Sequence, residues 1–157
     1  MRRSDREITD RNDIIQVMEK CDVCRIALND EGYPYILPLN FGMKAEHGEI
    51  TLYFHGAWEG KKYELIAKDN RASFEMDCSH ELFTEISHGN CTMAYESVIG
   101  RGRIEIVPED EKYEGLKILM KHYHEEDFPF NKLVIPQTVV FKLIVDAEYI
   151  SGKRRVK

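Results

Sequence analysis

The segment from Phe54 to Lys62 holds residue types that could bind an anion. Its two glycines, Gly56 and Gly60, would let the backbone come close to a ligand, and the cations Lys61 and Lys62 follow directly. If a strand passes into a helix here, the first turn of that helix adds free N–H groups and a partial positive charge. The segment therefore fits either a phosphate site or a tight turn with two solvated lysines, and composition alone favours the turn.

His55 precedes the first glycine and could give a further hydrogen bond to the anion. A nucleoside-triphosphate loop is excluded, because that pattern has four residues between its glycines and then Lys and Ser or Thr. In this chain three residues lie between the glycines, and Lys62 stands where the hydroxyl residue should be. A dinucleotide fingerprint is excluded too, since Gly100-Arg101-Gly102-Arg103 has no third glycine and no helix is expected after it.

The cysteines were weighed as metal ligands. Cys21 and Cys24 have the spacing of a ligand pair, and Cys78 with His80 could complete a set. However, Cys78 and His80 do not form a standard second pair, and alternation along a strand would bury one of the first two thiols. Buried structural thiols explain the pattern better. We therefore expect Cys21, Cys24, Cys78 and Cys91 to be free thiols and expect no metal site.

The bulk composition narrows the class of protein. The chain has 157 residues, the size of one domain, and a net charge of −6. A general nucleic-acid binder needs a basic surface, so no nucleic-acid partner is expected. No apolar run approaches the roughly 20 residues that cross a bilayer, and no apolar stretch follows the charged N-terminus. We therefore expect a cytoplasmic protein with no membrane partner.

The hydrophobic pattern predicts the elements that must position the Phe54–Lys62 segment. Helices are expected from Thr9 or Asp10, over about 58–68 and over 108–123. Strands are expected at 23–28, 33–43, 50–55, 72–78, 91–107 and 139–145, with a polar loop before residue 91. Pro34 and Pro38 cannot donate ladder hydrogen bonds, so the second strand should be bent, bulged or at an edge.

Short turns between the early strands indicate antiparallel pairing. Six such strands with few helices favour a mostly β fold, a small closed or split barrel, over a doubly wound sheet. No linker or repeat divides the chain, so residues 1–157 form one predicted domain. Its last residues, about 151–157, are a basic tail that is expected to be disordered and solvated.

The chain resembles the nitroimidazole-resistance-type flavoproteins, a branch of the pyridoxamine-5'-phosphate-oxidase-like split-barrel superfamily. The likeness follows the order of helices and strands over nearly the whole chain. It rests on four stretches: Gly32-Tyr33-Pro34-Tyr35 with Pro38-Leu39-Asn40-Phe41-Gly42, Tyr53-Phe54-His55-Gly56-Ala57 with Gly60-x-Lys62, Glu96-Ser97-Val98-Ile99-Gly100-x-Gly102, and Met120-Lys121-His122-Tyr123.

This resemblance implies a six-stranded antiparallel split β-barrel of the FMN-binding type, forming a homodimer with flavin at the subunit interface. It implies that Pro38, Leu39 and Asn40 line the flavin ring. It implies that the segment containing Phe54, His55, Gly60, Lys61 and Lys62 holds the phosphate side. Ser97, Val98 and Ile99 would approach from the barrel face or from the partner subunit. Gly56 stands where the family often has a serine, so one phosphate hydroxyl is absent here.

The function implied is that of an FMN-dependent oxidoreductase, with FAD as the alternative flavin. It would reduce small organic compounds, nitroaromatic 5-nitroimidazoles among them, with a nicotinamide donor, and His55 would be the catalytic residue. A non-catalytic flavin-binding or storage protein and a haem-binding split-barrel protein are the alternatives. The basic tail could instead fold near the flavin phosphate in the dimer.

Overall fold

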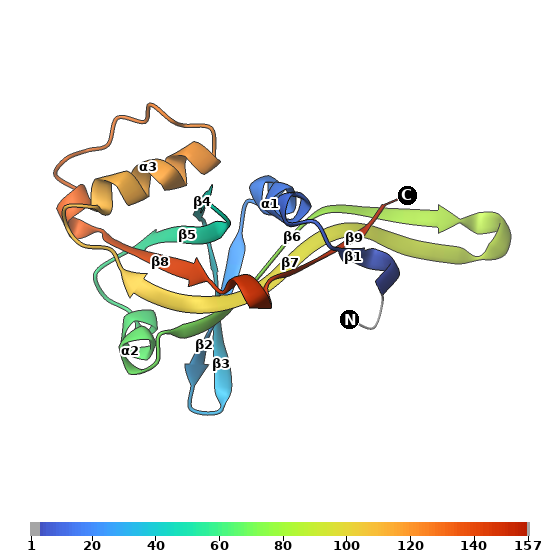
Figure 1. The fold of residues 1–157 in the computed structure, drawn as a ribbon, viewed down its shortest axis with the longest axis horizontal. Coiled ribbons are helices and arrows are strands. Elements are labelled where there is room, and N and C mark those ends of the chain that lie inside the picture. The colour runs from blue at the N-terminus through green and yellow to red at the C-terminus, as the bar shows by residue number, and fades with distance from the viewer. Residues whose placement is uncertain (1–3, 157) are drawn as a thin grey trace.

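The computed structural model describes residues 4–156 and is built on one strongly curved antiparallel sheet (Figure 1). The main path of the sheet runs in the order β3-β2-β6-β7-β8-β5-β4. These strands are β2 Cys24–Asp30, β3 Tyr33–Leu39, β4 Gly42–Glu46, β5 Glu49–Gly56, β6 Arg71–Glu85, β7 Asn90–Ile106 and β8 Val139–Val145. The two ends of the path, β3 and β4, are consecutive in the chain, so the sheet curls back on itself as a barrel.

The strand predicted over 33–43 is the bend that closes this barrel. It breaks into β3 and β4 at Asn40 and Phe41, two residues after Pro38, which lacks the N–H needed to continue a regular ladder. Phe41 is fully buried at the bend and holds it against the core. Counted as one bent strand, β3 and β4 make a six-stranded antiparallel split barrel, which confirms the predicted fold class.

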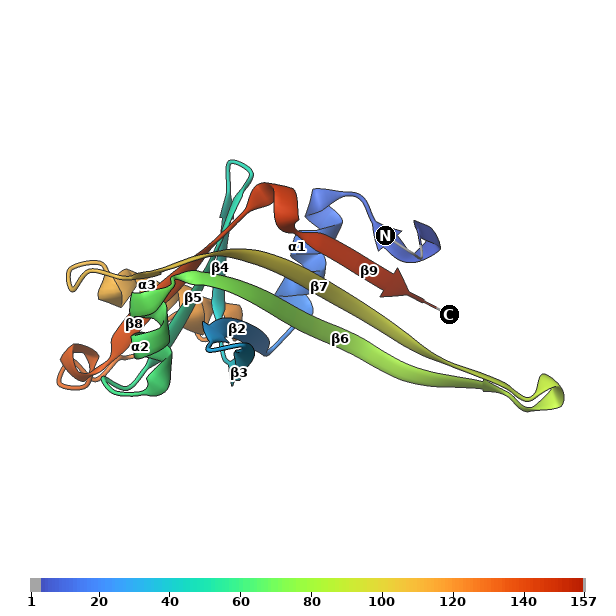
Figure 2. The same cartoon turned by 90° about the horizontal axis from the view of Figure 1, so that it is seen from below.

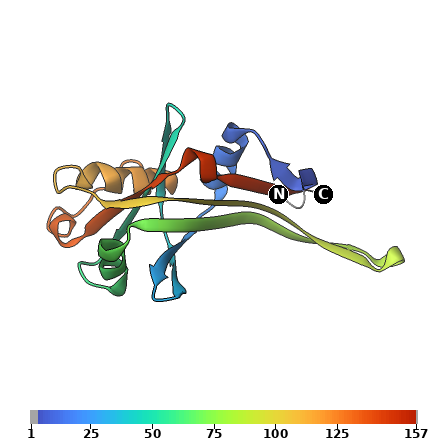
Figure 3. The ribbon, with the colours of Figure 1, turned by 60° about the horizontal axis from the view of Figure 1, so that its bottom comes forward.

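The prediction of a polar loop before residue 91 is wrong, because β6 and β7 continue there as a long two-stranded arm (Figures 2 and 3). Pairing shifts register between Cys78 and Glu81, which is the mark of a β-bulge. Beyond the bulge the ladder resumes and runs to a 3-10 turn at Ile86–His88. A bulge bends a strand without ending it, so the polar residues beyond the bulge remain paired with β7.

The prediction of a disordered tail is also wrong for residues 151–155. Ser151–Arg155 forms β9, which pairs with β7 and with the short N-terminal strand β1, Glu7–Ile8. Gly152 is buried between Ile8 and Ile14 and lies opposite Val98 of β7. The residues that follow it are basic, and in the sequence such a run of like charges favours a solvated tail over a strand.

Three α-helices pack on the described part of the barrel: α1 Arg11–Lys20, α2 Lys61–Lys68 and α3 Lys112–His122. Asp10 caps α1 by accepting hydrogen bonds from the backbone of Asn12 and Asp13, as predicted. The second helix begins three residues later than expected, because Gly60 has φ 143°, which no helix can contain. No helix among residues 4–156 is long and apolar enough to cross a membrane.

Inward-facing side chains of all these strands fill one core. Phe54 and Phe141 are fully buried and stack at 5.3 Å between ring centroids. Each such side chain contributes roughly 1.5–3 kcal/mol by leaving water. Outside the barrel, α3 lies directly on β4, since a Cβ placed at Gly42 would be 2.4 Å from the Leu119 Cα. The core thus fixes β5 and its end, where the candidate site begins.

Candidate functional site

The turn between β5 and α2 brings the Lys62 amine close to both glycines of the predicted phosphate segment. A Cβ placed at Gly56 would lie 3.2 Å from Lys62 Nζ, and one placed at Gly60 would lie 3.5 Å from it. Among residues 4–156 no carboxylate pairs with this amine, which lies 4.4 Å from the centroid of the Tyr63 ring. The glycines, the amine and the N-terminus of α2 together offer the groups that bind a phosphate.

Lys61, the other predicted phosphate ligand, is already paired. Its amine forms a salt bridge with Asp30 at the β2–β3 turn and lies 5.5 Å from the Tyr35 ring centroid. The hydrogen bond to Asp30 raises the pKa of Lys61, so the amine remains charged but neutralised locally. The two lysines therefore point to different neighbours, and Lys62 is the one available in the turn.

His55 lies on the other face of β5 from Phe54, as alternation along a strand requires. It lines a mostly apolar cavity of about 390 Å³ between β5, α3 and the segment 128–138. The other lining residues are Leu116, Leu119, Met120, Phe128, Pro129, Phe130, Asn131, Val134, Ile135 and Thr138. His55 is exposed at its outer side, but partial burial of the ring lowers its pKa, which favours the neutral imidazole. One chain thus places His55 and Lys62 on opposite sides of the strand end.

The predicted ring-contact residues lie at the β3–β4 bend. Asn40 donates a hydrogen bond from Nδ2 to Tyr123 Oη at 3.2 Å, and Tyr123 donates to the Asp22 carbonyl at 2.7 Å. The Phe41 N–H also donates to Tyr123 Oη, at 3.1 Å. This network joins the end of α3 to the bend. Pro38 and Asn40 are exposed, whereas Leu39 is half-buried and packs against the core.

The predicted β7 residues divide between the two faces of the strand. Val98 is fully buried, so only its backbone is open to a ligand, and the same holds for Phe54. Ser97 and Ile99 face outward, and Ile99 is 52% exposed. Pro38 and Ile99 share the outer face of the sheet, but β2 and β6 lie between their strands, a separation of roughly 14 Å at the usual strand spacing. One chain alone therefore does not bring the predicted ring contacts together.

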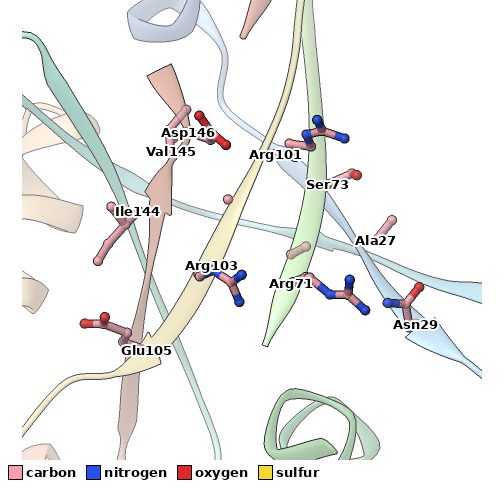
Figure 4. Close-up of a pocket in the computed structure, with 12 residues that line it drawn as sticks. Ala27, Asn29, Arg71, Ser73, Arg101, Arg103, Glu105, Ile144, Val145 and Asp146 are labelled. Carbon is pink, nitrogen blue, oxygen red and sulfur yellow. The ribbon is translucent and has the colours of Figure 1, made fainter. Parts of the chain in front are cut away.

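Sequence reasoning missed a second basic region, on the outer face of β2, β6 and β7 (Figure 4). Arg71, Arg101 and Arg103 line a hollow of about 570 Å³ there, with Asn29 and Ser73 beside them. The signal was available, because arginines two residues apart on one strand face the same side. We refer to this group of five residues as the arginine pocket.

The cysteines are free thiols. Burial raises the pKa of Cys24 to about 12, and burial together with neighbouring Cys78 raises the pKa of Cys21, so neither is a ready nucleophile. Within the described residues no group of His, Cys, Asp and Glu side chains is arranged to hold a metal ion.

The curled six-stranded sheet with its flanking helices defines a split β-barrel protein. The family model described as pyridoxamine 5'-phosphate oxidase matches residues 10–154. The chain therefore belongs to this family. A search of curated proteins finds no significant match.

Similar solved structures agree with this assignment. A candidate 5-nitroimidazole antibiotic resistance protein from Bacteroides thetaiotaomicron is 31% identical, with a TM-score of 0.80 over 94% of this chain and 85% of that one. The FAD and heme binding protein from Mycobacterium smegmatis has a TM-score of 0.81 at 18% identity, over 97% and 74% of the two chains. The flavocytochrome Anf3 from Azotobacter vinelandii has a TM-score of 0.80 at 20% identity, over 100% and 72%. The last two likenesses concern the fold alone.

Proposed function

We propose that the protein binds a flavin whose phosphate occupies the β5–α2 turn, and that it acts as an oxidoreductase on small organic compounds. The observation that supports this most is the position of the Lys62 amine near Gly56 and Gly60 at the start of α2, with no carboxylate partner among residues 4–156. FMN ends in a phosphate that such a turn suits, and in FAD the corresponding phosphate belongs to a diphosphate. Family membership and the flavoproteins among the similar structures support the same cofactor class.

We further propose that the flavin lies between two copies of the chain. The outer face of the sheet leaves large apolar side chains in solvent, with Ile36 at 62% and Ile99 at 52% exposure. Since Pro38 and Ile99 are far apart within one chain, a second copy packed on the part of this face around Pro38 and Ile99, four residues along β7 from Arg103, would bring Ile99 of one copy to Pro38 and Asn40 of the other. Such a dimer would have two-fold symmetry, which is the commonest symmetry among assemblies of identical chains.

The chain's own residues would bind and orient the flavin. Lys62 and the backbone N–H groups at the start of α2 would neutralise the phosphate, while the β3–β4 bend, held by Tyr123, would present Asn40 beside the ring. A bound flavin supplies hydride and electron transfer, so the protein needs no separate acid–base pair for that step. The neutral imidazole of His55 would accept a proton from a substrate bound in the apolar cavity beside it.

The first test is the visible spectrum of the purified protein, followed by titration with FMN and FAD. Flavin absorbance, or saturable binding on titration, is expected, and the absence of both would refute the proposal. Turnover with NADH or NADPH and a 5-nitroimidazole acceptor then separates an oxidoreductase from a flavin-storage protein. A yellow protein that passes no electrons to any acceptor would leave storage as the function.

One observation favours a second candidate, haem binding. His55 offers a neutral imidazole at the wall of an apolar cavity, and neutral imidazole is the common protein ligand of haem iron. Two of the similar structures are a heme-binding protein and a flavocytochrome. Titration with hemin should give a Soret band that the His55→Ala protein lacks, and an equal band in both proteins would rule out this ligand.

A further inference from the structure

The arginine pocket places positive charges where a strand ladder normally avoids them. Arg71 stands directly opposite Arg103 across the β6–β7 ladder, and Ser73 stands opposite Arg101. Like charges directly opposite on neighbouring strands destabilise a sheet. Such a conflict within an otherwise regular strand pair is typical of a functional site.

Among the described residues, only one of the three guanidinium groups has a carboxylate partner. Arg71 forms a salt bridge with Asp69 at 2.7 Å. Arg103 donates to the amide oxygen of Asn70 at 3.2 Å, and Arg101 lies 3.3 Å from the centroid of the Tyr149 ring. Among residues 4–156 neither Arg101 nor Arg103 has a carboxylate within ion-pair distance. Their neighbours thus hold two charged groups in position without cancelling their charge.

The hollow beside these groups has donors on one side and carboxylates on the other. Asn29, Ser73 and the three arginines lie on the β2, β6 and β7 side in Figure 4. Glu105 and Asp146 lie toward β8, where Glu105 pairs with Lys142 at 3.7 Å and Asp146 accepts the Glu148 N–H at 3.2 Å. The backbone N–H of Asp146 donates to the Arg101 carbonyl at 2.9 Å, but within residues 4–156 neither carboxylate forms an ion pair with Arg101 or Arg103.

We propose that the arginine pocket binds a phosphate group of a nucleotide, separate from the phosphate in the β5–α2 turn. The planar guanidinium group donates two parallel hydrogen bonds that match a phosphate, and Arg also stacks on aromatic bases. The eight residues of α2, about 12 Å in length, separate Gly60 from Asp69 and Arg71. A phosphate held at Lys62 is therefore not the one held at Arg103.

Phosphate binding by the pocket does not depend on the proposed function, but the identity of the nucleotide rests on it. Two sources share the required chemistry: the adenylate half of FAD and a nicotinamide dinucleotide donor. The first makes FAD a better ligand than FMN. The second makes the pocket part of the electron-donor site.

The binding test uses inorganic pyrophosphate and 5'-AMP, titrated into the flavin-free protein by isothermal calorimetry. Arg101→Gln and Arg103→Gln should each weaken pyrophosphate binding at least tenfold, and the double variant more. Arg25→Gln is the matched control, because Arg25 lies on the same sheet face, two residues from Ala27, but pairs with Glu75 and Asp77. Its affinity should stay within twofold of the parent. Equal pyrophosphate affinity in the parent, the two single variants and the double variant, or no binding by the parent, overturns the proposal.

The source test compares ligands in the same variants. If FAD is the source, Arg103→Gln weakens FAD binding tenfold and leaves FMN binding unchanged. If the donor is the source, Arg103→Gln raises the KM for the dinucleotide tenfold and leaves both flavin affinities unchanged. If Lys62→Gln loses FMN binding but keeps pyrophosphate binding, the two phosphate sites are independent, and failure of one proposal can be told from failure of the other. Dissociation of an oligomer by Arg103→Gln, in a protein that does not bind pyrophosphate, would assign the arginines to a subunit contact and overturn the site.

Discussion

Glu96 should be the most sensitive polar position for stability. It is a buried carboxylate on β7, 6% exposed, and it joins three other elements. It accepts hydrogen bonds from Arg154 Nε of β9 at 2.7 Å, from Ser79 Oγ beside the bulge at 2.9 Å and from Lys20 at the end of α1. The bulged arm, the C-terminal strand and the first helix are therefore fixed to one carboxylate.

The Glu96→Gln change keeps the shape but removes the charge. Hydrogen bonds to a charged group contribute about 1.5–3 kcal/mol and neutral ones about 1 kcal/mol. Lys20 and Arg154 are half-exposed, so solvent weakens their share, and we expect a total loss of about 2–3 kcal/mol. For a chain of this size that is a fall in Tm of roughly 4–12 °C. Glu96→Ala, which leaves its donors unpaired, should cost about 3–5 kcal/mol.

The assay is urea unfolding at pH 7 followed by circular dichroism, with Glu114→Gln as control. Glu114 also pairs with a lysine, Lys117 at 3.4 Å, but on the surface, and its loss should cost under about 0.5 kcal/mol. Burial alone would raise the pKa of Glu96, but the hydrogen bonds from Lys20, Ser79 and Arg154 outweigh it and lower the pKa. The contribution of Glu96 to stability is therefore fully present above the pKa that its carboxyl group has in the unfolded chain. It is lost as the pH falls below that pKa and through the lower pKa of the folded protein. Equal unfolding free energies for the two variants would refute the role given to Glu96.

Three further predictions concern other parts of the fold. NMR titration of His55 should give a pKa below 6.5, because its apolar surroundings disfavour the charged ring; a value above 6.5 would mean that the cavity wall is polar in solution. Gly42→Ala should destabilise the protein by about 1–3 kcal/mol in urea unfolding, since the new methyl group would meet the backbone of α3; an unchanged midpoint would mean that α3 is not seated on β4. Asp10→Ala should cost about 1 kcal/mol in thermal unfolding through loss of the α1 cap, with Asp10→Asn nearly neutral; equal losses in both would exclude capping as the cause.

Sequence patterns predicted the elements whose signals are local. Alternating apolar residues located most barrel strands, Thr9 or Asp10 marked the start of α1, and Pro34 and Pro38 indicated an irregular strand that became β3, the bend and β4. The four stretches that carry the resemblance also indicated the family. These signals work because side-chain period, capping and proline chemistry act within a few residues.

The features that were missed depend on contacts between distant residues. Ser151–Arg155 is polar and becomes a strand only because β7 and β1 offer edges to it. Lys61 and Lys62 are equivalent in sequence, and only Asp30, 31 residues earlier, distinguishes them. Arg71 and Arg103 become neighbours only through the β6–β7 register. A bulge such as that after Cys78 likewise has no fixed residue signature.

The most direct test of the flavin phosphate site compares FMN with riboflavin, which lacks the phosphate, in Lys62→Gln and Lys61→Gln proteins. The dissociation constant is measured by quenching of flavin fluorescence. Lys62→Gln should weaken FMN binding by roughly 10-fold or more, as expected for the loss of one charge-assisted hydrogen bond, and leave riboflavin binding unchanged. Lys61→Gln, whose charge is already matched by Asp30, should bind both ligands nearly as the parent does. Equal FMN affinity in the parent and Lys62→Gln proteins would contradict the placement of the phosphate in the β5–α2 turn.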